Sequence, residues 1–125
     1  MVSIPSFLLK RLYVKGSLKN SSGGFEFTLK NGLGSGYAHK MHPLIVDDKT
    51  VHEESTFFYL DGREVAFSDV TSENTFTLAM NRDIVIRSEG VHLDPGPHKI
   101  CMSFDVPGLG TLKFDFIDKL SNPLE

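Results

Sequence analysis

The chain has 125 residues, of which 40% are hydrophobic and 23% charged, and its formal net charge is −3. This size predicts one domain spanning residues 1–125, and the composition is typical of a soluble globular protein. The negative balance argues against a nucleic-acid binder, which needs a basic surface to replace phosphate counterions.

The chain's single cysteine, Cys101, excludes an internal disulfide framework and a zinc site made of several cysteines. The first 16 residues lack the basic lead and the apolar run of a signal peptide. No stretch approaches the roughly 20 apolar residues that a membrane span requires. We therefore expect a cytoplasmic protein without a membrane partner.

In chain order, the predicted elements are mostly strands. The segment Leu8–Lys15 reads as a weak strand, and Gly24–Lys30 as a strong one because apolar and polar residues alternate along it. The pair Asp61-Gly62 predicts a hairpin, and the polar run at 67–74 a short helical turn. Further weak strands are predicted at Pro43–Val46, Thr56–Leu60, Glu64–Phe67, Thr75–Met80 and Asp83–Arg87.

The C-terminal third predicts a long hairpin. Apolar residues alternate along 99–106 and again along 111–118, and Pro107-Gly108 between them fits the central positions of a type II turn. Turn signals recur every 8–12 residues or so along the chain, the rhythm of a sandwich or barrel. We therefore expect an all-β protein, a two-sheet antiparallel β-sandwich of Ig-like or jelly-roll style with about eight or nine strands.

The stretch His92–Met102 gathers two histidines, an aspartate and Cys101. Pro95-Gly96 fits a type II turn that delivers the chain into a strand. Alternation then places His98 at the inner rim of the sheet and Cys101 on the opposite face, which disfavours a shared metal site. We interpret the stretch as a turn with a rim histidine that bonds to backbone, and we keep His98 as a candidate ligand or partner contact.

A second histidine group comprises His39, His42, His52 and Glu54. In an extended strand His39 and His42 would face opposite sides, so a metal bound by this group is a minority hypothesis. A role for His39 and His42 in contacting a ligand or a partner fits better, because loops carry recognition.

The glycine-rich run at 32–37 ends in Tyr37. It lacks the third glycine and the following helix of a dinucleotide fingerprint, and also the Walker A lysine. A surface loop is the ordinary interpretation, with Tyr37 as a candidate aromatic contact for a sugar or a partner. No residue is identified as catalytic, since no nucleophile motif is found and Cys101 lacks a neighbouring base.

Several short sequence motifs resemble those of the β subunits of C-glycoside deglycosidases. They are "GFEFTL", "GLGSGY", Val46-Asp47, "VAFSDV" and the strand entry Leu93-x-Pro95-Gly96-x-His98, and they span roughly Gly24 to Asp105. The resemblance implies a β-sandwich subunit that associates with a larger TIM-barrel, sugar-isomerase-like subunit. That partner would carry the divalent metal and the general base for carbon–carbon cleavage of 3-oxo-C-glycosides, while this chain would hold no cofactor and shape the site.

Chains of this appearance are also similar to ones labelled hydroxymethylglutaryl-CoA reductase. We give that label little weight, because the reductase resembles a much longer enzyme with a nucleotide-binding domain, and no dinucleotide site is found here. Two alternatives to the subunit hypothesis stay open. One is a free-standing binding or self-assembling module, with a carbohydrate as a possible ligand. The other is a cupin-like metal enzyme built on the second histidine group.

Overall fold

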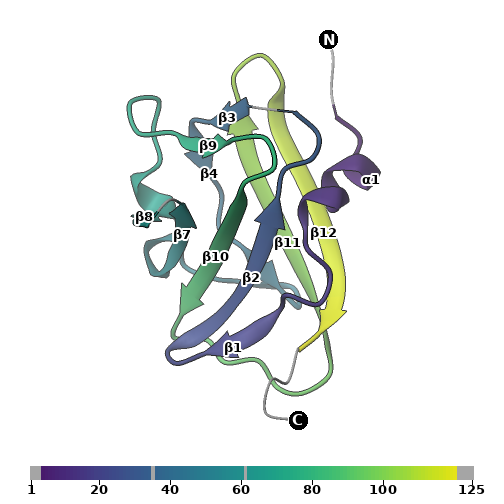
Figure 1. The fold of residues 1–125 in the computed structure, drawn as a ribbon. Coiled ribbons are helices and arrows are strands. Elements are labelled where there is room, and N and C mark those ends of the chain that lie inside the picture. The colour runs from purple at the N-terminus through teal and green to yellow at the C-terminus, as the bar shows by residue number, and fades with distance from the viewer. Residues whose placement is uncertain (1–3, 35, 61, 121–125) are drawn as a thin grey trace.

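The computed structural model describes residues 4–34, 36–60 and 62–120. Two antiparallel sheets pack face to face as a β-sandwich, with a small two-stranded sheet at one end (Figure 1). The predicted all-β fold class is therefore confirmed. Twelve strands are formed in this part of the chain rather than eight or nine, because several are only two or three residues long.

The first sheet has the order β1-β2-β10-β7-β8. Its strands are antiparallel throughout, and β10 lies between β2 and β7. The Asp61-Gly62 hairpin is confirmed by the pairing of β7 with β8, although Asp61 itself lies outside the described residues. Gly62 has φ 78°, which a glycine adopts without strain. The bounds are β1 Lys19–Ser21, β2 Gly24–Lys30, β7 Thr56–Leu60, β8 Arg63–Ala66 and β10 Asp83–Glu89.

The second sheet has the order β12-β11-β5-β6, and β4 also pairs with β11. The long hairpin of β11 and β12 is confirmed. Gly108 in its turn has φ 84°, and the Leu109 amide donates to the Val106 carbonyl at 3.0 Å. The bounds are β4 Lys40–Met41, β5 Ile45–Val46, β6 Lys49–Thr50, β11 Pro97–Val106 and β12 Gly110–Lys119; the small third sheet pairs β3 Gly36–Ala38 with β9 Phe76–Leu78.

The strand predicted at Leu8–Lys15 is wrong. The structure has instead a short helix α1 (Ser6–Leu9) followed by a 3₁₀ turn η1 (Lys10–Leu12). Leu9 and Leu12 are three residues apart and both buried, so a helical turn puts both on the core side. Two more 3₁₀ turns are η2 (Glu53–Ser55) and η3 (Phe67–Asp69), and η3 fits the helical turn predicted there.

The core lies between the inner faces of the two large sheets. Phe25, Phe27 and Leu29 of β2 are fully buried, as their alternation predicts. Tyr13 follows η1 and stacks on Phe116 of β12 with a ring-centroid distance of 3.7 Å, while Phe27 meets Phe116 edge-on at 5.3 Å. These aromatic rings join the two sheets along one side of the sandwich.

α1 and η1 contact β12, which is an edge strand of its sheet, and the chain then crosses toward β2, where the Val14 amide donates to the Thr28 carbonyl at 2.9 Å (Figure 1). Lys10 forms an ion pair with Asp115 at 3.7 Å. Further along, Asp118 accepts hydrogen bonds from the Tyr13 hydroxyl at 2.6 Å and from the Gly16 amide at 2.8 Å. No helix in the described residues is long and apolar enough to cross a bilayer.

Candidate functional site

A cavity of about 330 Å³ opens at one end of the sandwich, between the β5–β6 hairpin and the loop that joins β10 to β11. Its apolar lining is formed by Val46, Val51, Val91 and Leu93. The polar lining residues are Asp47, Lys49, Thr50, His92, Asp94 and His98. The cavity therefore combines an apolar surface with a small set of polar groups, as small-molecule sites do.

Asp47 is placed by the tight turn between β5 and β6. Asp47 and Asp48 have φ values of 50° and 69°, as a two-residue type I′ hairpin turn requires, and aspartate tolerates this region better than most residues. The turn aims the Asp47 carboxylate at β11, where it accepts a hydrogen bond from the Lys99 amide at 2.9 Å. The Asp47 amide in turn donates to the Lys99 carbonyl at 2.9 Å.

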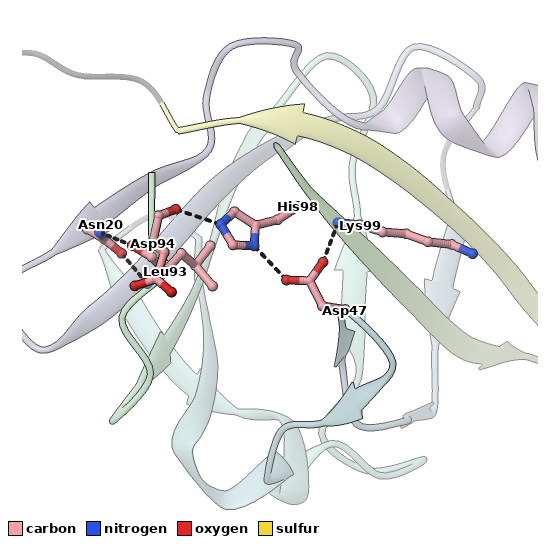
Figure 2. Close-up of polar contacts among 6 residues, drawn as sticks. All are labelled: Asn20, Asp47, Leu93, Asp94, His98 and Lys99. Atoms are coloured by element: carbon pink, nitrogen blue, oxygen red, sulfur yellow. Dashed lines mark hydrogen bonds and ion pairs between the residues drawn. The ribbon is translucent and has the colours of Figure 1, made fainter. Parts of the chain in front are cut away.

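His98 lies at the start of β11 with a side chain only 12% exposed. Its Nδ1 is 2.6 Å from Oδ2 of Asp47, and its Nε2 is 2.7 Å from the Asp94 carbonyl oxygen (Figure 2). Both partners are acceptors without a proton to give. When both contacts are hydrogen bonds, both ring nitrogens donate, and the ring is then the charged imidazolium.

The two contacts shift the titration of both partners. The bond to the Asp94 carbonyl, followed by the bond to Asp47, raises the pKa of His98 above its ordinary value of 6.5. The bond from His98, followed by that from the Lys99 amide, lowers the pKa of Asp47 below 3.8. The charged form of each group is thus stabilised by the other.

The loop that forms one wall of the cavity is held from β1. The Asn20 side-chain amide donates to the Leu93 carbonyl, and its oxygen accepts from the Leu93 amide, both at 2.9 Å (Figure 2). Nε2 of His92 lies 3.2 Å from the Ser21 carbonyl oxygen. Leu93 is buried beneath these contacts. The wall is therefore fixed before any ligand arrives.

This arrangement suits binding better than proton transfer. A general base or a metal-ligating histidine needs a ring nitrogen with a free lone pair, which the charged form of His98 does not have. The structure also places His98 as the sequence predicted, at the sheet rim with a bond to backbone. Its role as a ligand or partner contact stays a prediction.

The other candidate histidines have separate surroundings. His42 bonds through Nε2 to Asp105 at 2.9 Å, and Asp105 also accepts from the Thr111 hydroxyl at 2.6 Å. His39 lines a different cavity, of about 380 Å³, together with Glu53 and Phe67. Among the residues that the structure describes, no group of three or more His, Cys, Asp or Glu side chains is placed to hold a metal ion.

Tyr37 lies on β3 at the opposite end of the sandwich and is 48% exposed. It lines an apolar pocket of about 90 Å³ with residues of α1 and of the β11–β12 hairpin. In the described part of the glycine-rich run, the Asn31 side-chain amide donates to the Gly34 carbonyl and its oxygen accepts from the Leu33 amide. Tyr37 is therefore available for a contact, which stays a prediction.

Sequence reasoning missed two residues that build this site. Asp47 entered the sequence analysis only in the Val46-Asp47 motif of the resemblance, yet it is the partner of His98; the Asp-Asp pair between two short strands was the available signal. Asn20 gave no signal, because it is 73 residues from Leu93 along the chain.

The chain was compared with known protein families and with curated proteins. The model of the family described as "Hydroxymethylglutaryl-CoA reductase, N-terminal domain" matches residues 8–121, nearly the whole chain. The search of curated proteins gave no match.

The resemblance to C-glycoside deglycosidase β subunits is therefore wrong, as is the little weight given to the reductase label. The most specific motifs of that resemblance, Val46-Asp47 and Leu93-x-Pro95-Gly96-x-His98, contain turns. Asp47 has a positive φ in a left-handed turn, and Gly96 has φ 112°. Any β-sandwich with turns of these types favours the same residues, glycine, proline and aspartate. The chain belongs to the hydroxymethylglutaryl-CoA reductase N-terminal domain family.

Proposed function

We propose that this chain is a non-catalytic accessory domain that binds a catalytic partner polypeptide. The observation that carries the proposal is the state of His98, which lines the 330 Å³ cavity. Both of its ring nitrogens contact other residues of the fold, Asp47 and Asp94. The family description supports the same role, because it names a domain of a reductase rather than a complete enzyme.

The partner of first choice is a hydroxymethylglutaryl-CoA reductase catalytic polypeptide, since the family description names that enzyme. The TIM-barrel partner and the 3-oxo-C-glycoside substrate came only from the deglycosidase resemblance and are not part of the proposal. A cavity wall that Asn20 holds at Leu93 supports recognition because little ordering is needed there on binding.

A second candidate function is that of a free-standing binding module. The observation in its favour is Tyr37, a half-exposed aromatic ring beside an apolar pocket, which could stack on a sugar. Calorimetry of the isolated chain with a panel of glycans tests this candidate. The matched variant Tyr37→Ala should abolish any binding found, while His39→Ala, at a different cavity, should leave it unchanged.

The accessory role is tested by adding the purified chain to the catalytic polypeptide of a hydroxymethylglutaryl-CoA reductase from the same organism. We expect a stable complex by size-exclusion chromatography and a change in the rate of hydroxymethylglutaryl-CoA reduction. The isolated chain should show no reduction. Reductase activity of the chain alone, or the absence of both a complex and a rate change, would contradict the proposal.

A further inference from the structure

We propose that His98 is a protonation-dependent latch that holds the 94–97 segment against the β5–β6 turn and so controls the mouth of the 330 Å³ cavity. The inference goes beyond the accessory role and stands without it, because it depends only on contacts within this chain. Its basis is the pair of acceptors, one on each side of a single imidazole ring, contributed by two different segments.

The geometry allows both contacts only in the charged state. An imidazolium donates from both nitrogens, whereas a neutral imidazole donates from one and presents a lone pair at the other. At 2.6 Å and 2.7 Å, a lone pair facing either oxygen is repulsive. Loss of one proton therefore breaks one of the two contacts.

The contact to Asp94 is the one expected to break. The proton of a neutral ring is held better by the Asp47 carboxylate than by a neutral carbonyl, because charge-assisted hydrogen bonds are stronger. Asp47 is also fixed on its other side by the Lys99 amide. The Asp94 carbonyl would then be left facing a lone pair and would move away.

The segment around Asp94 lies between an anchored residue on one side and a glycine on the other. Gly96, with φ 112°, lies on its C-terminal side, and Leu93 on its N-terminal side stays anchored by the two bonds to Asn20. Movement is thus confined to the few residues between these points. Asp94 and His98 both line the cavity, so their separation widens its mouth.

The charges around His98 favour the closed state at low pH. The bonds to Asp94 and Asp47 raise the pKa of His98, while the pKa of Asp47 is lowered. Asp118, the cross-strand neighbour of His98 on β12, is itself bound to Tyr13 and Gly16. The charged or titratable groups on the elements that surround His98 are Asp47, Asp48, Lys49, His92, Asp94, Lys99, Asp118 and Lys119.

The raised pKa of His98 and the lowered pKa of Asp47 decide over which pH range the latch is closed. Folding raises the pKa of His98. The stabilisation that charged His98 gives the closed latch is therefore complete below the ordinary pKa of 6.5 and is lost as the pH rises through the folded pKa. Because the pKa of Asp47 is lowered, its contribution is lost only as the pH falls below 3.8. The latch is closed between these limits.

The test is an NMR titration of the full chain with ¹⁵N-labelled histidines and ¹³C-labelled backbone carbonyls. We expect His98 to titrate above 6.5 with both nitrogens protonated at low pH. The carbonyl ¹³C shift of Asp94, which reports the loss of its hydrogen bond, should change with the same midpoint. The carbonyl ¹³C shift of Leu93, which accepts from the Asn20 side chain, should stay unchanged.

Two variants make the test specific. Asp47→Asn removes the carboxylate and should lower the His98 midpoint by about one pH unit, a tenfold change in proton affinity. The matched control, His92→Gln, alters a neighbouring cavity residue that contacts Ser21 and should leave the midpoint where it is. A midpoint at or below 6.5 in the unmodified chain, an Asp94 carbonyl shift that is the same on both sides of the midpoint, or an unchanged midpoint in Asp47→Asn would each overturn the proposal.

Discussion

The two ends of the sandwich are closed by different kinds of contact. At one end, where β11 begins and β12 ends, directional polar bonds join the segments: His98 to Asp47 and Asp94, Asn20 to Leu93, and Tyr13 to Asp118. At the other end, around the β11–β12 turn, apolar side chains of α1, the Tyr37 strand and the hairpin meet instead. We call these the polar end and the apolar end.

The two ends therefore have different roles in this small fold: the apolar end contributes stability, and the polar end positions the cavity. Apolar contacts are strong in sum, non-directional and insensitive to pH, so the apolar end contributes stability. Hydrogen bonds contribute less each, but they fix position and respond to protonation, so the polar end can hold a defined cavity and change it. The four predictions that follow test this division, from the largest expected effect to the smallest.

The largest effect is expected at the apolar end. Leu12→Ala removes a buried side chain that lines the apolar pocket and should lower the free energy of unfolding by about 2–5 kcal/mol. The loss should be the same at acidic and neutral pH. Urea unfolding of the variant measures it, with Phe7→Ala as the control: Phe7 lies on the same segment but is 66% exposed, and its removal should change little. Equal losses in both variants would contradict the assignment.

The next effect is expected at the polar end, where β2 meets β10. A methyl group on Gly24 would overlap the carbonyl oxygen of Ser88, so Gly24→Ala should cost about 1–3 kcal/mol through a forced backbone shift. Gly32→Ala is the matched control, since nothing lies within 4 Å of the added carbon there. Thermal unfolding followed by circular dichroism compares the two. A neutral Gly24→Ala variant would show that this end tolerates displacement.

A smaller loss is expected when a single bond of the polar end is removed. Tyr13→Phe keeps the stacking on Phe116 but removes the hydroxyl that donates to Asp118, which should cost about 1–2 kcal/mol. Burial, followed by the same bond to Asp118, raises the pKa of Tyr13 to about 12. Tyr59→Phe, which breaks the exposed hydroxyl contact with Glu64, is the control and should cost less. Urea unfolding at neutral pH distinguishes them.

The smallest expected effect is the response of the polar end to acid. Burial raises the pKa of Asp118, but the bonds from Tyr13, Gly16 and Lys119 outweigh it, and the net pKa lies below 3.8. The stabilisation is therefore present above the ordinary value and is lost as the pH falls through the folded pKa. In Asp118→Asn the slope of stability against pH should be shallower below about pH 4. An unchanged slope would show that Asp118 plays no part in acid unfolding.

Much of the fold could be predicted because the long strands carry a pattern of period two. Gly24–Lys30 and the hairpin strands each bury one face, and their alternation states which face. The N-terminal helical turn was missed because "FLLKRLYV" is too short to distinguish a period of two from one of 3.6. There, contact with β12 decides the conformation.

The site could be predicted only in part. The local turn at Pro95-Gly96 was enough to place His98 at the rim of a strand. Its partnership with Asp47 depends on β5 pairing with β11, which joins residues 51 positions apart, and no local pattern encodes that register. The short two-residue strands that bring Asp47 into place have almost no sequence signature of their own.

The segment from α1 to Gly16, which contacts β12, has a consequence for solubility. β12 is ten residues long and lies at the edge of its sheet, and an unguarded edge of that length invites pairing with other chains and aggregation. Lys10, Tyr13 and Gly16 hold the guarding segment in place through Asp115 and Asp118. Proteolytic loss of that segment would expose this edge, and because Leu9, Leu12 and Tyr13 would leave the core with it, the weakened sandwich would self-associate.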